Sequence, residues 1–114
     1  MVDGAREITV LHLPRFKAEA TKLIGVDGID AVAVYLSDHP DAGDVIPAAG
    51  GARKLRWAAK GKGKRGGARI IYLYVVIGAC IYLLRCYSKN VKADLTADEK
   101  KELRQIAAHL KGVQ

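Results

Sequence analysis

Residues 69–89, RIIYLYVVIGACIYLLRCYSK, decide the fold of this chain. Within them, the fifteen residues 70–84 carry no charge. A membrane-spanning helix needs roughly 20 apolar residues, so a membrane-anchored peptide is the weaker interpretation. The segment is rich in Ile, Val and Tyr and is interrupted by Gly78-Ala79. This pattern predicts two buried strands, 69–77 and 80–89, joined by a tight turn.

Immediately upstream the sequence alternates with a period of two. Leu55 and Trp57 fall on one face of an extended chain, and Lys54 and Arg56 fall on the other. We therefore expect a further strand beginning at Arg53. A basic, Gly-rich connection over residues 59–67 leads from it into the apolar pair of strands.

The N-terminal third predicts a short strand followed by helices. Residues 7–13 alternate in polarity, and Pro14 suits the first turn of a helix. An apolar stripe at helical spacing follows, with Gly25 as a stop signal; its members are Phe16, Ala20, Leu23 and Ile24. A second stripe precedes His39-Pro40, although its β-branched residues leave a strand possible; its members are Ile29, Val32, Ala33 and Leu36. We expect residues 38–51 to form a loop.

The C-terminus carries the signature of one more helix. Thr96 and Glu99 form a capping box, and Gly112 lies just past the expected end. The apolar stripe of this helix consists of Leu103, Ile106, Ala107 and Leu110. The fold class is therefore α+β, with N-terminal helices on one face of a small antiparallel sheet, a partly polar second face and a C-terminal helix. We expect residues 1–114 to form a single domain.

Charge is distributed unevenly along the chain. The formal net charge is −4 over residues 1–52, +10 over residues 53–90 and +1 over the remainder. The middle section contains no Asp or Glu. Like charges this close together repel, which favours a polyanionic partner. A solvated loop that only keeps the protein soluble is the alternative.

Strand parity predicts that several cations share one surface. Antiparallel pairing of the predicted strands can gather six side chains into a concave basic patch: Lys54, Arg56, Arg69, Arg85, Tyr87 and Lys89. Some of them could instead extend from sheet edges into solvent. Cations that point from apolar strands are costly unless an anion is expected, so we favour a polyanion site.

RNA is a polyanion that such a patch could cleave. RNA carries its own nucleophile, the 2′-OH, beside the scissile phosphate, so a protein needs only to align it, stabilise charge and move protons. We expect no metal or cofactor, because His12, His39 and His109 lack ligand spacing. The GxGxxG match at 61–66 lacks the helix and the acidic residue of a dinucleotide site. Two cysteines, Cys80 and Cys86, are expected to be buried thiols in a reducing cytoplasm.

Three segments, taken in their order along the chain, resemble the RelE/HigB family of toxins from bacterial type II toxin–antitoxin modules. They are GGARKLRW (50–57), GKGKRGGARIIY (61–72) and YSKNVKADL (87–95). The similarity is to the HigB-like branch with the GKGKRGG loop, and it covers about residues 36–110. The resemblance implies a RelE-like fold and a ribosome-dependent, metal-independent endoribonuclease that cuts mRNA in the ribosomal A site. It also implies a cognate antitoxin, usually a HigA-like helix-turn-helix protein.

The resemblance also implies roles for individual residues. Lys54 and Arg56 occupy positions of basic catalytic residues, Arg69 resembles the arginine that binds the scissile phosphate, and Lys89 supplies another cation. Some RelE members have a catalytic tyrosine in the C-terminal helix region, which Leu95-Thr96-Ala97 lacks, so Tyr87 or Lys54 are the candidates for the general base. The remaining cations are expected to grip RNA or the ribosome: Arg53, Lys60, Lys62, Lys64, Arg65 and Arg85. A non-catalytic RNA- or ribosome-binding module with the same basic face is the alternative function.

Overall fold

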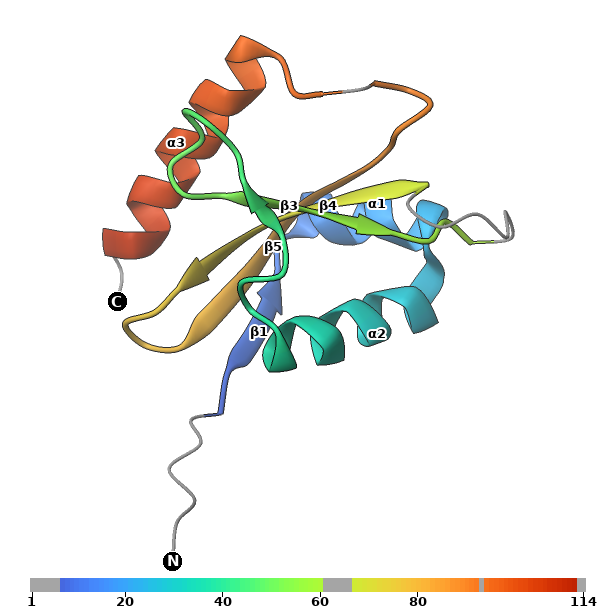
Figure 1. The fold of residues 1–114 in the computed structure, drawn as a ribbon, viewed down its shortest axis with the longest axis horizontal. Helices are drawn as coiled ribbons and strands as arrows, with labels where there is room; N and C mark the ends of the chain where they lie inside the picture. The colour runs from blue at the N-terminus through green and yellow to red at the C-terminus, as the bar shows by residue number, and fades with distance from the viewer. Residues whose placement is uncertain (1–6, 61–66, 93, 113–114) are drawn as a thin grey trace, which may run out of the picture.

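The structure is a computed structural model that describes residues 7–60, 67–92 and 94–112 (Figure 1). The elements follow one another as β1 (Thr9–His12), α1 (Pro14–Leu23), α2 (Gly25–Asp38), β2 (Asp44–Val45), β3 (Arg53–Trp57), β4 (Ala68–Val75), β5 (Cys80–Ser88) and α3 (Ala97–Gly112). The α+β class and the terminal helix predicted from the sequence are confirmed. The basic Gly-rich loop, including Lys62, Lys64 and Arg65, lies outside the described residues.

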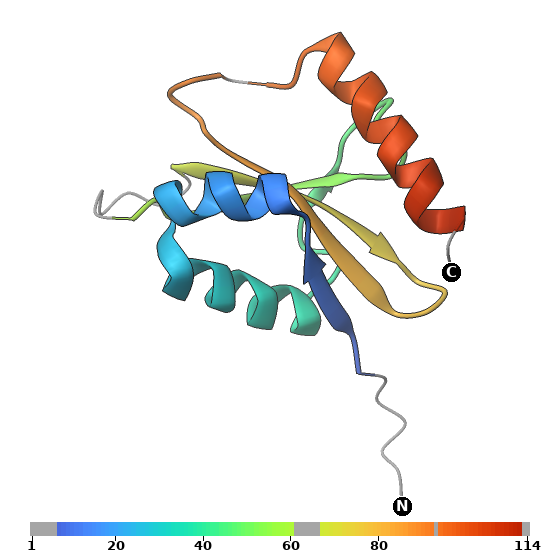
Figure 2. The same cartoon turned by 180° about the vertical axis from the view of Figure 1, so that it is seen from behind.

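The strands form one sheet in the order β1-β5-β4-β3-β2. From β2 to β5 each neighbouring pair is antiparallel, whereas β1 pairs with β5 in parallel. The prediction of an antiparallel sheet is therefore corrected at one edge. Helices α1 and α2 carry the chain from the β1 edge to the β2 edge, and the meander back brings β5 alongside β1 in the same direction (Figures 1 and 2).

The turn between β4 and β5 lies where the sequence predicted it and spans four residues, 76–79, between the paired residues Val75 and Cys80. Within this turn Gly78 and Ala79 have positive φ values, 91° and 49°, and the Ala79 N–H donates to the Val76 carbonyl oxygen at 3.0 Å. The apolar segment is thus a pair of strands, and this excludes its use as a spanning helix. Among the described residues, no helix combines the length and the apolar character needed to cross a membrane.

Helices α1 and α2 cover one face of the sheet (Figure 2). The stripes predicted from periodicity supply the contacts, with Phe16, Ala20, Val32 and Leu36 fully buried. They pack onto the β4 and β5 side chains of that face: Ala68, Ile70, Tyr72, Ile81, Leu83 and Cys86. Gly25 has a φ of 78° between the two helices, which is the left-handed conformation expected where α1 stops.

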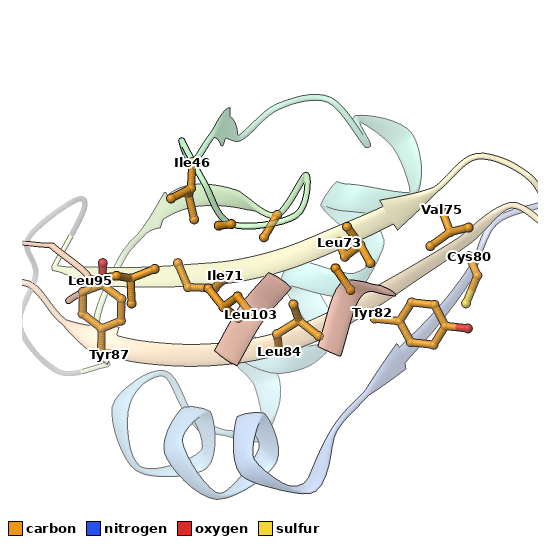
Figure 3. Packing of buried hydrophobic residues seen from close by; sticks show 13 residues of the cluster. Ile46, Ile71, Leu73, Val75, Cys80, Tyr82, Leu84, Tyr87, Leu95 and Leu103 are labelled. Atoms are coloured by element: carbon orange, nitrogen blue, oxygen red, sulfur yellow. The ribbon is translucent and has the colours of Figure 1, made fainter. Parts of the chain in front are cut away.

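The second face combines a hydrophobic core with polar side chains of β3 and β4, as the prediction of a partly polar face implies. Helix α3 and residues 46–52 cover it, and Figure 3 shows the side chains that meet there. Leu103 and Ala107 of α3 are buried against Ile71 and Leu73. The close approach explains Gly50, where an added Cβ would lie 2.8 Å from the Cβ of Ala107.

Several element boundaries differ from the sequence prediction; for example, β4 ends at Val75 and not at residue 77. The expected loop at 38–51 contains β2, because residues passing the free edge of β3 form two ladder pairs there, Asp44 with Lys54 and Val45 with Arg53. Helix α3 includes Gly112 instead of ending before it. The capping box at its start is confirmed: the Thr96 N–H donates to Glu99 Oε1 at 2.8 Å, and the Glu99 N–H donates to Thr96 Oγ1 at 3.1 Å.

Candidate RNA-cleavage site

A row of three polar side chains crosses the sheet on the face that α3 covers. Arg56 of β3 is the register partner of Arg69 of β4, and Arg69 is the register partner of Tyr87 of β5. Directly paired residues project to the same face. Because Tyr87 belongs to the core beneath α3, the whole row faces that side. The parity argument made from the sequence is confirmed for these three residues.

The two arginines of this row form an unfavourable pair. Like charges placed directly opposite each other across two strands destabilise a sheet. Arg56 is exposed and makes no ion pair with a described residue. Arg69 is partly buried, and its Nη1 donates to the carbonyl oxygen of Ala68 at 3.2 Å. Two arginines at directly paired strand positions concentrate positive charge on this face, which favours the approach of an anion.

Lys54 lies on the same face but is paired with a carboxylate. Its register partner is Ile71 of the core beneath α3. Its Nζ lies 3.6 Å from Oδ1 of Asp94, on the segment that joins β5 to α3. A lysine among other cations could act as a general base, but Lys54 has an acidic neighbour in the structure. Lys54 therefore loses the reason for proposing it as a general base.

Asp94 is ionised where it lies. Its Oδ1 accepts a hydrogen bond from the Leu95 N–H at 2.8 Å. That bond is the largest influence on the pKa of Asp94 and lowers it below its ordinary value; burial opposes this effect, and the charges of Lys54 and Lys100 add to the lowering. The site thus contains an exposed carboxylate beside the cations.

Tyr87 is buried at the end of the row, with 6% of its surface exposed. Figure 3 shows its ring beside Leu95, and Lys92 Nζ lies 5.3 Å from the ring centroid. The hydroxyl is covered and has no hydrogen-bond partner in the described part of the chain. Burial raises the pKa of Tyr87, and Asp94 adds to this, while Arg69 acts against it. At neutral pH Tyr87 is therefore a protonated phenol, which makes it a poor general base.

Arg53 and Arg85 lie away from this row. Arg53 falls on the α2 face, where its Nη1 donates to the Gly43 carbonyl oxygen at 2.8 Å and its Nη2 lies 3.6 Å from Asp41. Arg85 is only 8% exposed and donates three hydrogen bonds to the Glu19 carboxylate, at 2.8–3.1 Å. Arg85 is the register partner of Ile71 and so projects to the same face as Tyr87, as strand parity predicted, but its guanidinium is bound to Glu19 of α1. Both arginines hold the fold together, and we do not retain them as RNA-binding residues.

Lys89 and Lys60 lie beyond the ends of strands. Strand β5 ends at Ser88, so the alternation that placed Lys89 on the face of Tyr87 no longer applies; Lys89 is exposed in the following turn, and its N–H donates to Gly67. Lys60 bonds through its N–H to the Leu23 carbonyl oxygen at the end of α1. Both lysines remain available to a large anion, but neither belongs to the row.

Three residues near the row were not assigned a role from the sequence: Lys92, Asp94 and Glu99. Lys92 and Asp94 fall within the segment that carried the family resemblance, and Glu99 was recognised only as part of a capping box. The segment between β5 and α3 has no periodicity, so nothing in its pattern indicated which side chains turn back toward the sheet. The one available signal was Asp94 itself, which is the first carboxylate after a long stretch of sequence without Asp or Glu.

The α+β fold thus carries two arginines at directly paired strand positions and an exposed carboxylate on the segment before its last helix. The family model described as the RelE toxin of the RelE / RelB toxin–antitoxin system matches residues 41–114. The match covers more than half of the chain and contains every residue of the row. The protein belongs to the RelE toxin family, and its role is that of a toxin with an antitoxin partner.

Proposed function

We propose that the protein is an endoribonuclease that cleaves mRNA on the ribosome and thereby inhibits translation. RelE toxins are generally endoribonucleases. The observation that supports the activity here is the pairing of Arg56 with Arg69 on one face. Two guanidinium forks at adjacent strand positions match the non-bridging oxygens of a phosphate that gains charge as it is attacked.

The remaining steps need a proton acceptor for the 2′-OH and a proton for the leaving oxygen. The RNA 2′-OH attacks the adjacent phosphate, the bond from phosphorus to the 5′-oxygen breaks to leave a 2′,3′-cyclic phosphate, and the 5′-oxygen takes up a proton from water, so the reaction can proceed without a metal ion. Asp94 is an ionised carboxylate close to the row and could accept the proton of that hydroxyl. Lys54 would hold Asp94 in place, and Lys89 would contact the flanking backbone. The covered hydroxyl of Tyr87 does not support a direct role in catalysis, so the participation of Tyr87 in the reaction stays a prediction.

The finer classification rests on the sequence resemblance. We propose that the chain belongs to the HigB-like branch, that its antitoxin is a HigA-like helix-turn-helix protein, and that the toxin acts in the cytoplasm. Lys60, Lys62, Lys64 and Arg65 would grip ribosomal RNA. We also propose that residues 1–114 act as one domain, since Glu19 of α1 binds Arg85 within the part that matches the family.

Replacement of Arg69 tests the activity. We expect Arg69→Ala to slow cleavage of mRNA on programmed ribosomes by about 100-fold or more, the loss seen when one preorganised donor to a developing oxyanion is removed. Arg69→Lys should recover only part of the rate, because it keeps the charge but not the two-pronged geometry. Lys101→Ala, on the exposed side of α3, is the surface control and should cleave normally.

The products distinguish a nuclease from a binding module. A nuclease leaves discrete 3′ ends within translated messages, whereas a non-catalytic binder blocks translation and leaves messages intact. Persistent toxicity from an Arg69→Ala protein with an unchanged thermal unfolding midpoint would contradict the assignment. So would intact messages in cells arrested by the natural protein.

A further inference from the structure

Glu99 makes more contacts than a helix cap requires. Its Oε1 accepts the Thr96 N–H and completes the capping box of α3. A capping box needs one side-chain oxygen at this position, and Gln supplies it as well as Glu. The cap alone therefore gives no reason for a charge here.

The second carboxylate oxygen of Glu99 contacts two cations. Oε2 accepts a hydrogen bond from Lys92 Nζ and lies 3.9 Å from Arg85 Nη1. The side chain is 19% exposed, so both contacts are partly shielded from water and are stronger than surface ion pairs. The bond from Lys92 is the largest influence that lowers the pKa of Glu99, followed by the bond from the Thr96 N–H.

The two oxygens hold residues on either side of Asp94. Lys92 precedes Asp94 by two positions, and Thr96 follows it by two. We propose that Glu99 is a positioning residue of the cleavage site: by binding Lys92 and Thr96 together it fixes the chain around Asp94 and holds that carboxylate beside Lys54. This inference rests on the proposed function, since it assigns Glu99 a part in the same site.

Few other contacts join Asp94 to residues outside the segment between β5 and α3. Its side chain is 59% exposed, and its ion pair with Lys54 spans 3.6 Å between partly exposed groups. Such a pair holds a side chain weakly in water. A proton acceptor that must meet a ribose hydroxyl needs a defined position before the substrate arrives. Glu99 supplies it from α3, an element anchored in the core through Leu103 and Ala107.

Glu99→Gln separates positioning from capping. The amide oxygen of Gln can still accept the Thr96 N–H, while the charge that attracts Lys92 and Arg85 is removed. The matched control is Asp98→Asn, which removes one negative charge from the same exposed helical turn. Asp98 contacts none of the site residues named above, so its replacement should leave cleavage unchanged.

We expect Glu99→Gln to lower the single-turnover cleavage rate roughly 5- to 30-fold, which is the effect of losing one charge-assisted hydrogen bond. Lys92→Gln should have an effect of similar size. If Glu99 acts through Lys92, the double variant should be no slower than either single variant, as a double-mutant cycle would show. Additive losses, or an equal loss in Asp98→Asn, would overturn the inference.

A second readout does not depend on cleavage. The carboxyl carbon of Asp94 can be titrated by NMR, and its pKa in the natural protein lies below the ordinary 3.8 through the Leu95 N–H and Lys54. We expect Glu99→Gln to raise that pKa toward 3.8 and Asp98→Asn to leave it in place. An unchanged Asp94 titration in Glu99→Gln would contradict the positioning role. If the natural protein failed to cleave mRNA, the proposed function would fall, and the titration would still decide whether Glu99 positions Asp94.

Discussion

At the scale of single residues, Arg56 and Arg69 are the feature that packing does not explain. Arg69 lies on β4, whose other side chains on that face, such as Ile71 and Leu73, are apolar and buried, and Arg56 is its register partner on β3. Two arginines at directly paired strand positions cost folding free energy through repulsion. A fold that retains such a pair gives up stability in exchange for a preorganised anion site. The RNA phosphate of the proposed reaction is the anion that fits it.

The buried hydroxyl of Tyr87 leads to a prediction that separates stability from activity. A covered hydroxyl without a partner is unfavourable, so Tyr87→Phe should raise the free energy of unfolding by about 1 kcal/mol. Because the hydroxyl is covered and stays protonated, cleavage should persist in the variant. Urea denaturation and the ribosome cleavage assay measure the two effects. A 100-fold loss of cleavage would restore Tyr87 as a catalytic group.

Tyr72 provides the matched control for this substitution. Its hydroxyl donates to the Pro40 carbonyl oxygen at 2.8 Å and accepts the Gly43 N–H at 2.9 Å. Tyr72→Phe would leave both backbone groups without that partner, and we expect it to lower the free energy of unfolding by about 1–2 kcal/mol. If the two Tyr→Phe changes shift the free energy of unfolding in opposite directions, the effect depends on whether the removed hydroxyl was hydrogen-bonded. Equal signs would contradict this explanation.

Sequence parity correctly placed Arg56, Arg69 and Tyr87 because strand alternation is local and regular. It also placed Arg85 on that face, as the pairing with Ile71 bears out, but it could not reveal that Glu19, a residue 66 positions away, binds the guanidinium of Arg85. It also could not place Asp94, which lies in a segment without secondary structure. The site is therefore predictable from sequence where it is built on strands. Where a loop or a long-range ion pair supplies the side chain, only the folded arrangement reveals it.

At the scale of elements, Arg85 connects helix α1, strand β5 and helix α3. It binds Glu19 of α1 through three hydrogen bonds and lies near Glu99 of α3. Glu19 also accepts the Cys86 N–H at 3.0 Å. Burial and the nearby Glu19 together raise the pKa of Cys86 to about 12, so its thiol stays protonated and inert. This cluster joins the residues before the family match to the sheet that carries the site.

The same cluster predicts how stability depends on pH. Burial by itself would raise the pKa of Glu19, but the bonds from Arg85 and Cys86 outweigh it and hold the pKa below the ordinary 4.5. The unfolded chain therefore binds a proton first as the pH falls, and the stabilisation is complete above pH 4.5 and is lost below it. We expect Glu19→Gln to lower the free energy of unfolding at neutral pH by about 2 kcal/mol.

The difference in the free energy of unfolding between Glu19→Gln and the natural protein should shrink as the pH falls from about 5 to about 3, because the Glu19 carboxylate of the natural protein then loses its charge too. Asp30→Asn, an exposed carboxylate on α2, is the control and should change stability little at any pH. Denaturation curves measured across this pH range provide the test. A difference that stayed constant with pH would show that the Glu19 charge does not stabilise the fold.

At the scale of the whole molecule, the fold separates the charges that the sequence already distributes unevenly. Helix α2 carries Asp27, Asp30 and Asp38 and covers the face of the sheet opposite the arginine row. Arg53 and Arg85 pair with Asp41 and Glu19 of the acidic N-terminal section, whereas the arginine row lies on the face opposite the aspartates of α2. A molecule with separated charge orients in the field of a polyanion before contact, and this raises the association rate. The ribosome is the polyanion that the proposed function supplies.

Ribosome association should therefore depend steeply on salt, and chiefly through the basic loop. Replacing Lys62, Lys64 and Arg65 by Gln removes three cations that the family resemblance assigns to RNA contacts. We expect the slope of log K against log salt to become shallower by roughly 2–3, because each phosphate contact contributes about 0.7–0.9. The control replaces Lys17, Lys22 and Lys101, which are exposed on α1 and α3, and has the same net charge. If cosedimentation with ribosomes fell equally in both triple variants, net charge alone would account for binding, and the loop would have no specific role.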